Sequence, residues 1–158
     1  MSSTQDQKIN LPILNLPHFE PTIRQSDGKL WIFDSLRKKY LVLTPEEWVR
    51  QHWTNYLINH QDYPGGLFSL EKGLKYNKLQ KRTDLVVFDR EGKPYLLVEC
   101  KAPTIRINDQ TLGQAMAYNR ELNCPNLILS NGIKHFYMAY DSDEKKFIQR
   151  QSLPICPK

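Results

Sequence analysis

Three ionisable side chains stand at the ends of two apolar segments, where a sequence normally places core residues. Asp84 opens the run TDLVVFD, and Glu99 and Lys101 close the run KPYLLVECK. Fourteen residues separate Asp84 from Glu99, which suits a strand, a tight turn and a returning strand. The two ends of such a hairpin meet, so the two carboxylates should lie side by side. Lys101 shares a face with Glu99 because strand side chains alternate with a period of two.

This arrangement fits a metal site with hydrolytic chemistry. Burying two carboxylates close to a core costs free energy, and a divalent cation offsets their mutual repulsion. Magnesium keeps several waters, one of which can be deprotonated and directed at a phosphodiester. Lys101 could orient that water or neutralise charge developing on the phosphate. A structural ion pair at a strand end, Glu99 with Lys101 or Asp84 with Arg82, explains the same residue types equally well from the pattern alone.

Length and composition indicate one globular domain. The chain has 158 residues, of which 40% are hydrophobic and 25% charged. No apolar run approaches the roughly 20 residues that span a bilayer, and residues 1–10 are polar, so we expect a cytoplasmic protein. The three cysteines form no CxxC pair and are expected as thiols. We expect a flexible N-terminus over residues 1–10, a domain over 11–153 and a tail over 154–158.

The net charge of +5 makes a polyanionic partner plausible. Part of the basic excess lies just before Asp84, where a solvated face is the alternative explanation. The candidate phosphate-binding residues there are Lys75, Lys78, Lys81 and Arg82.

The elements expected along the chain alternate between strands and helices. Asp27-Gly28 sits between two β-rich segments and predicts a hairpin. Thr44, Pro45 and Glu47 form a Thr-x-x-Glu capping box that begins a helix, whose buried face should carry Val49, Trp53, Tyr56, Leu57 and His60. Residues 67–75 are expected as a strand, followed by the hairpin of TDLVVFD and KPYLLVECK.

The second half of the chain continues the pattern. A second helix capped by Asn108 should bury Leu112, Ala115, Met116 and Leu122. The apolar run NLILS is expected as a central strand, and two further segments joined through SDE as a last hairpin. This order predicts an α/β fold, a mixed β-sheet flanked by helices on both faces, with a β-α-β crossover from LLVECK to NLILS.

Asp84 followed by Glu99-Cys100-Lys101 resembles the D…ExK signature of the PD-(D/E)XK nuclease superfamily. Gln114 and Tyr118 resemble the Q-x-x-x-Y helix of its RecB-like members. The wider run from about Trp31 to Tyr140 is similar to the N-terminal domains of type I restriction enzyme R subunits. The resemblance implies a restriction-endonuclease-like fold and hydrolysis of DNA that depends on Mg²⁺, for which Mn²⁺ is the expected substitute.

The same resemblance implies roles for individual residues. Asp84, Glu99 and the backbone carbonyl of Cys100 would bind the metal, and Lys101 would be the catalytic lysine. Superfamily members often carry another acidic residue upstream, for which Glu71, and Glu47 or Glu46, are the candidates here. The capping box offers a competing explanation for Glu47.

Two of the remaining patterns have simpler explanations. Gln114 and Tyr118, spaced i and i+4, share a helix face, and Tyr118 would also suit the edge of a core. Cys100 beside Glu99 suggests a nucleophile with His135, but alternation turns Cys100 to the opposite, apolar face, and no local signature supports that chemistry.

The sequence departs from the resemblance in two ways, and the departures leave a choice of function. Thr83 replaces the proline of the motif, and 158 residues leave no room for a helicase motor. The first interpretation is an endonuclease acting on DNA. The alternative is a nuclease-like nucleic-acid-binding or assembly subunit that needs a partner, such as another restriction-type subunit, for activity. A homodimer is an expectation from the superfamily alone.

Overall fold

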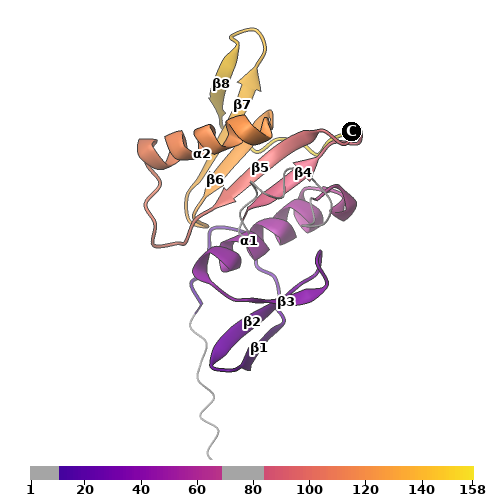
Figure 1. The fold of residues 1–158 in the computed structure, drawn as a ribbon, viewed down its shortest axis with the longest axis vertical. Coiled ribbons are helices and arrows are strands. Elements are labelled where there is room, and N and C mark those ends of the chain that lie inside the picture. Colours follow the sequence, from indigo (N-terminus) through magenta and orange to yellow (C-terminus); the bar gives the residue numbers. More distant parts are fainter. Residues whose placement is uncertain (1–10, 69–83) are drawn as a thin grey trace, which may run out of the picture.

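The computed structural model describes residues 11–68 and 84–158, which form two β-sheets and two α-helices. Figure 1 shows them as successive layers: helix α2, a five-stranded sheet, helix α1 and a three-stranded sheet. The five-stranded sheet has the order β4-β5-β6-β7-β8 and contains both parallel and antiparallel pairs. The predicted mixed sheet with a helix on each face is therefore confirmed.

The first sheet consists of β1 (Ile23–Ser26), β2 (Lys29–Asp34) and β3 (Lys39–Val42), paired antiparallel in that order. The predicted hairpin turn at Asp27-Gly28 is confirmed, and both residues have positive φ, at 52° and 71°. β3 was not predicted. The N-terminal unit is consequently a sheet of three strands rather than a hairpin.

Helix α1 (Pro45–Asn55) begins where the sequence indicates, with the Thr44 hydroxyl accepting a hydrogen bond from the backbone of Glu47. The chain then widens into a π-helical turn, Tyr56–His60. Val49, Trp53 and Leu57 are fully buried as predicted. His60 is exposed, so its assignment to the buried face was wrong, because the wider π turn changes the helical period before that last residue.

The predicted hairpin around the acidic residues is confirmed as β4 (Leu85–Phe88) and β5 (Pro94–Cys100). In its turn, the Asp89 carboxylate accepts from the backbone N–H groups of Glu91 and Lys93, each at 2.9 Å. The strand expected over residues 67–75 differs at its start, since Leu67 closes a 3-10 turn, Gly65–Leu67. Phe68 forms a single antiparallel bridge to Val87, and the remainder lies outside the described residues.

The crossover from β5 through α2 (Asp109–Leu122) to β6 (Asn126–Ser130) is confirmed, and β5 and β6 pair in parallel. β6 is the middle strand of the five, as its apolar run predicts. The last hairpin forms from β7 (His135–Asp141) and β8 (Lys146–Arg150) and projects beyond α2 in Figure 1.

Two apolar clusters cover the two faces of the larger sheet. The cluster on the α1 side includes Val49, Trp53, Leu85 and Val98, and the cluster on the α2 side includes Val86, Leu97 and Ala115. The end of the chain packs against the first cluster: the hydroxyls of Tyr63 and Tyr95 donate to the carbonyls of Pro154 and Ile155 at 2.7 and 2.6 Å. Across the described ranges, we find no helix with the length and apolarity to cross a membrane.

Candidate acidic site at the end of strand β5

The hairpin register brings the two predicted carboxylates together. Leu85 is opposite Val98 in the antiparallel pair of β4 and β5, and continuing that register by one residue places Asp84 opposite Glu99. The Cβ atoms of such directly opposed residues lie about 4.5–5.5 Å apart. Asp84 and Glu99 are 1% and 2% exposed, so both carboxyl groups are held inside the protein.

Strand alternation assigns this pair to the α2 side of the sheet. Val86 and Leu97, each two residues from one of the carboxylates, belong to the α2-side cluster. Tyr118 packs against the same cluster from α2. Gln114, one turn earlier on the helix, is exposed. The helix that carries Gln114 and Tyr118 therefore covers the face to which the carboxylates point, although only Tyr118 is packed into it.

Lys101 follows β5 and lies beside the acidic pair. Its Nζ is 3.1 Å from Oε1 of Glu99, and its backbone N–H donates to the carbonyl of Ser130 at 2.8 Å. The side chain of Lys101 is 25% exposed, whereas that of Glu99 is buried. The ammonium thus connects a buried carboxylate to the protein surface, in the position that the sequence predicts.

Cys100 occupies the other face of the sheet. It belongs to the α1-side cluster, and burial, followed by the charge of Asp84, raises the pKa of its thiol well above the ordinary value. His135 is engaged elsewhere, with its ring nitrogens hydrogen-bonded to the Ser130 hydroxyl and the Asn15 carbonyl. Burial and the separate contacts of His135 therefore argue against a cysteine nucleophile.

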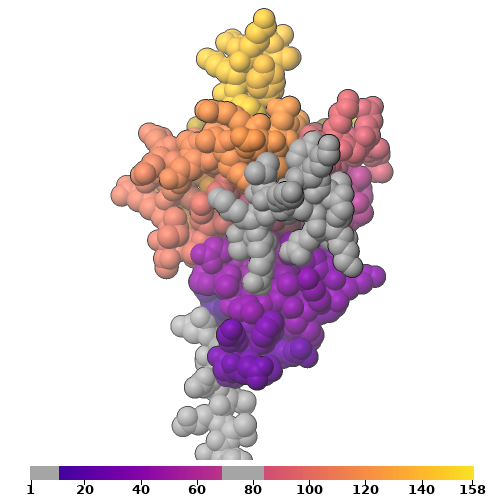
Figure 2. Space-filling view, in the orientation of Figure 1, coloured from indigo at the N-terminus to yellow at the C-terminus, as the bar shows by residue number. Residues whose placement is uncertain are grey.

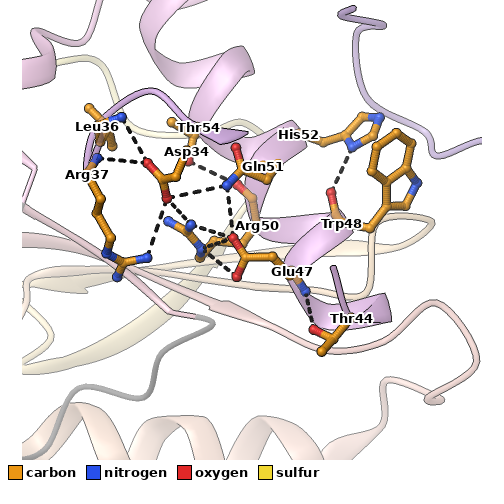
Figure 3. Close-up of polar contacts among 10 residues, drawn as sticks. All are labelled: Asp34, Leu36, Arg37, Thr44, Glu47, Trp48, Arg50, Gln51, His52 and Thr54. Atoms are coloured by element: carbon orange, nitrogen blue, oxygen red, sulfur yellow. Dashed lines mark hydrogen bonds and ion pairs between the residues drawn. The ribbon is translucent and has the colours of Figure 1, made fainter. Parts of the chain in front are cut away.

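A second group of buried charges lies on α1, drawn in Figure 3. Arg50 is 1% exposed and donates through Nε to both carboxylate oxygens of Glu47, at 3.0 and 3.1 Å. Its Nη2 donates to Asp34 at the end of β2 and again to Glu47. Arg37 completes the group with a contact to Asp34 at 3.4 Å. Two guanidinium groups and two carboxylates thus neutralise one another between α1 and the three-stranded sheet.

The charges of this α1 network shift the pKa values of its members. Burial raises the pKa of Asp34, but the charge and hydrogen bonds of Arg50 outweigh that effect, and the pKa lies below its ordinary value. Burial opposes the charged form of Arg50, yet its hydrogen bonds and charge interaction with Glu47 raise the pKa of the guanidinium. Both groups are accordingly charged at neutral pH, as a buried ion pair requires.

The capping box predicted around Glu47 forms only in part. Thr44 accepts from the Glu47 backbone at 3.0 Å, but the Glu47 carboxylate binds Arg50 and Gln51. The prediction that capping accounts for the Glu47 side chain was therefore wrong, because a buried arginine offers a stronger, charge-assisted hydrogen bond than a backbone N–H. Glu47 remains a candidate metal ligand only by exchanging Arg50 for the cation.

Several predicted site residues cannot be placed. They lie outside the described residues: Glu71, Lys75, Lys78, Lys81 and Arg82.

The donor set can be compared with the needs of a metal ion. Among the residues that the structure describes, no group of three or more His, Cys, Asp or Glu side chains is arranged to hold a metal. Magnesium does not require one, since it commonly binds one or two carboxylates and keeps waters and phosphate oxygens as its other ligands. The opposed carboxylates of Asp84 and Glu99 meet that requirement.

Fold and site together define an α/β protein with a central mixed sheet and a candidate acidic site at the carboxyl end of one of its strands. The family model for the type I restriction enzyme R protein N terminus matches residues 45–154, and the chain belongs to that family. A search of curated proteins gives no match. The matched segment runs from α1 to the last strand and contains Asp84, Glu99 and Lys101, but it leaves out the three-stranded sheet.

Proposed function

We propose that this protein is a metal-dependent endonuclease of the PD-(D/E)XK superfamily, with a restriction-endonuclease-like fold, that hydrolyses phosphodiester bonds of DNA. The observation that carries the proposal is the site at the end of β5: Asp84 opposite Glu99 in the hairpin register, with the Lys101 ammonium 3.1 Å from Glu99. Membership of a restriction-enzyme family supports it, because that family relates the chain to proteins that act on DNA.

Asp84, Glu99 and the backbone carbonyl of Cys100 would hold Mg²⁺, or Mn²⁺ in its place. Such an ion, when bound, lowers the pKa of a coordinated water and offsets negative charge on a phosphate. The carboxylates fix where the phosphate is attacked, because they are buried and positioned by the sheet. Lys101, held by Glu99 yet partly exposed, can orient the attacking water and stabilise charge on the phosphate oxygens.

Gln114 and Tyr118 would contribute from α2. Tyr118 is packed over the face of the sheet that carries the acidic pair, and Gln114 is exposed one helical turn away. An exposed amide in that place can hydrogen-bond to a nucleotide, whereas Tyr118 can support the carboxylates from within the protein. The basic residues Lys75, Lys78, Lys81 and Arg82 would bind phosphates of DNA that approaches the acidic site. We also propose that the protein is cytoplasmic.

A second candidate function follows from the family itself. The family is that of the N-terminal part of the R protein, which is a component of type I restriction enzymes. This chain would then act as a nuclease-like subunit, either with other restriction subunits as partners or as a homodimer. In that case it would bind metal and DNA but would cleave only in the assembly.

Cleavage of supercoiled plasmid and of single-stranded DNA in Mg²⁺ or Mn²⁺ tests the proposal. Lys101→Ala should lower the cleavage rate by about 10²–10⁴-fold, the usual effect of losing an acid–base group, while Lys146→Ala, an exposed lysine of β8, serves as the control. Asp84→Asn should abolish the rise in melting temperature that Mg²⁺ produces in the wild type.

Each outcome separates the candidate functions. A metal-dependent thermal shift without cleavage supports the subunit function, and addition of the partner subunits should then restore activity. Cleavage that survives Lys101→Ala contradicts the site, and the absence of both cleavage and a metal-dependent shift contradicts the metal site altogether.

A further inference from the structure

Two short segments leave the sheet side by side next to the candidate site. The loop of residues 101–108 follows β5, and the turn of residues 131–134 follows β6. Because β5 and β6 are parallel neighbours, both segments leave the same edge of the sheet, and Lys101 bonds to Ser130 across it at 2.8 Å. The salmon-coloured residues that lead from β5 into α2 form the left flank of the molecule in Figure 2.

Asn131 holds these two segments together. Its side chain is nearly buried, and its Nδ2 donates to the carbonyl of Ile105 at 2.8 Å. Its Oδ1 accepts from the backbone N–H groups of Ile133 and Lys134 at 2.9 and 2.8 Å. One carboxamide therefore links the backbone of Ile105 to that of Ile133. These hydrogen bonds hold the loop of residues 101–108 and the turn of residues 131–134 in a single arrangement.

The residues presented by this arrangement repeat one chemical pattern. Each segment carries an isoleucine followed by a basic residue: Ile105-Arg106 in the loop and Ile133-Lys134 in the turn. The isoleucines are 44% and 43% exposed, and Arg106 and Lys134 are exposed as well. Neither basic side chain makes an ion pair with any residue of the described ranges.

We propose that these four residues, Ile105, Arg106, Ile133 and Lys134, form a DNA-binding ridge that seats duplex DNA next to the candidate site. The inference rests on the proposed function. Arg106 and Lys134 bind phosphates, which is the charge complementarity that a nucleic acid offers. The isoleucines contact sugars and base edges in the minor groove, where apolar side chains of other proteins are inserted between base steps.

The position of the ridge explains what it would do for catalysis. It begins four residues after Lys101, whose Nζ lies against Glu99, so DNA bound on the ridge passes the end of β5. Because Asn131 fixes the backbone before binding, little conformational entropy is lost when DNA arrives. The ridge is therefore suited to hold one phosphate at the acidic pair while it holds the neighbouring phosphates itself.

Fluorescence anisotropy of a short labelled duplex in EDTA, where no metal-dependent cleavage occurs, tests the ridge on the full chain. Arg106→Ala/Lys134→Ala should weaken binding about ten- to hundredfold near 0.1 M salt, and should reduce the slope of log K against log salt by about 2. Ile105→Ser/Ile133→Ser should weaken binding without changing that slope. The matched control is Lys29→Ala/Lys146→Ala, which removes the same charge from exposed positions on β2 and β8.

The outcomes distinguish the ridge from the nuclease proposal. If Arg106→Ala/Lys134→Ala binds like the control pair while Lys101→Ala still abolishes cleavage, the ridge is wrong and the nuclease proposal stands. If the wild type neither binds duplex nor cleaves it, both are wrong. Melting temperatures of all variants must match the wild type, which is expected because the substituted side chains are exposed.

Discussion

Arg50→Met should destabilise the protein by about 3 kcal/mol at pH 7.5. The substitution keeps a long apolar stem but removes the guanidinium that binds Asp34 and Glu47, which are 1% and 0% exposed. Breaking a buried pair by removing one partner costs about 3–5 kcal/mol. We expect the lower value because Arg37 still contacts Asp34 at 3.4 Å and Gln51 still donates to Glu47 at 2.9 Å.

Urea denaturation measures this loss directly. With an m value of about 2 kcal/mol per molar, the midpoint should fall by about 1.5 M. The triple variant Asp34→Asn/Glu47→Gln/Arg50→Met also replaces the two carboxylates that lose Arg50. It should be at least about 1 kcal/mol more stable than the single variant, because burying a neutral amide costs less free energy than burying an unpaired charge. Arg150→Met removes an exposed arginine paired with Asp141 and should leave the midpoint unchanged.

The same variant has an expected pH dependence. Without Arg50, burial prevails and the pKa of Asp34 rises above its unfolded value. A carboxyl group with a raised folded pKa favours folding at low pH, so the deficit relative to the wild type should shrink as the pH is lowered from 7.5 to about 5. The reasoning is refuted if the single variant loses less than about 1 kcal/mol, or if the triple variant is no more stable than the single one.

Three further predictions concern the histidines, a turn and helix α2. Burial lowers the pKa of His52 and of His135, so their neutral forms stabilise the fold above pH 6.5, and this stabilisation should be lost as the pH falls through the folded pKa values. The melting temperature should therefore decrease between pH 7.5 and about 5, and less so in His52→Gln/His135→Gln; a wild-type melting temperature that stays constant would contradict this. Gly132→Ala should cost about 2 kcal/mol in urea denaturation, because φ is +85° and the new Cβ would lie 2.9 Å from a methyl carbon of Leu14. Gly113→Ala, in α2 with no atom within 4 Å of the added Cβ, should instead stabilise the protein by about 0.5–1 kcal/mol.

The part of the fold that the sequence predicts is the part with local signals. The β4–β5 hairpin follows from an apolar run, a turn and a second apolar run, and its length alone places Asp84 against Glu99. The crossover to β6 follows from the helical period between two apolar strands. Those signals depend only on residues that are close in sequence, so they can be recognised without knowledge of tertiary contacts.

The missed features depend on contacts between distant segments. β3 (Lys39–Val42) has only four residues and is stabilised as a strand by pairing with β2. Asn131 stands directly before Gly132 in a local turn signal, although its side chain also connects two loops through a hydrogen bond to the carbonyl of Ile105. An Asn-Gly pair indicates a turn equally well with or without such a long-range bond.

Helix α1 shows most clearly why periodicity was insufficient. All eight of its residues from Glu47 to Thr54 are buried, although the sequence pattern predicts only one buried face. The apolar face packs on the larger sheet, while the polar face meets Asp34 of the three-stranded sheet. A helix covered on both sides must neutralise its charges internally, and the spacing of Glu47 and Arg50 satisfies that need.

This arrangement connects the two groups of buried charge at one strand end. The pKa of the buried Cys100 thiol is affected by charges from both groups. Arg50 and Glu47 act on it from the α1 side, and Asp84 and Glu99 act on it from the acidic pair. Asp34 lies outside the family match and Arg50 within it, so the added sheet supplies the carboxylate that shares the Arg50 guanidinium with Glu47. Loss of Asp34 would leave Arg50 to Glu47 alone, and the charges around the Cys100 thiol would change without any substitution in the acidic pair.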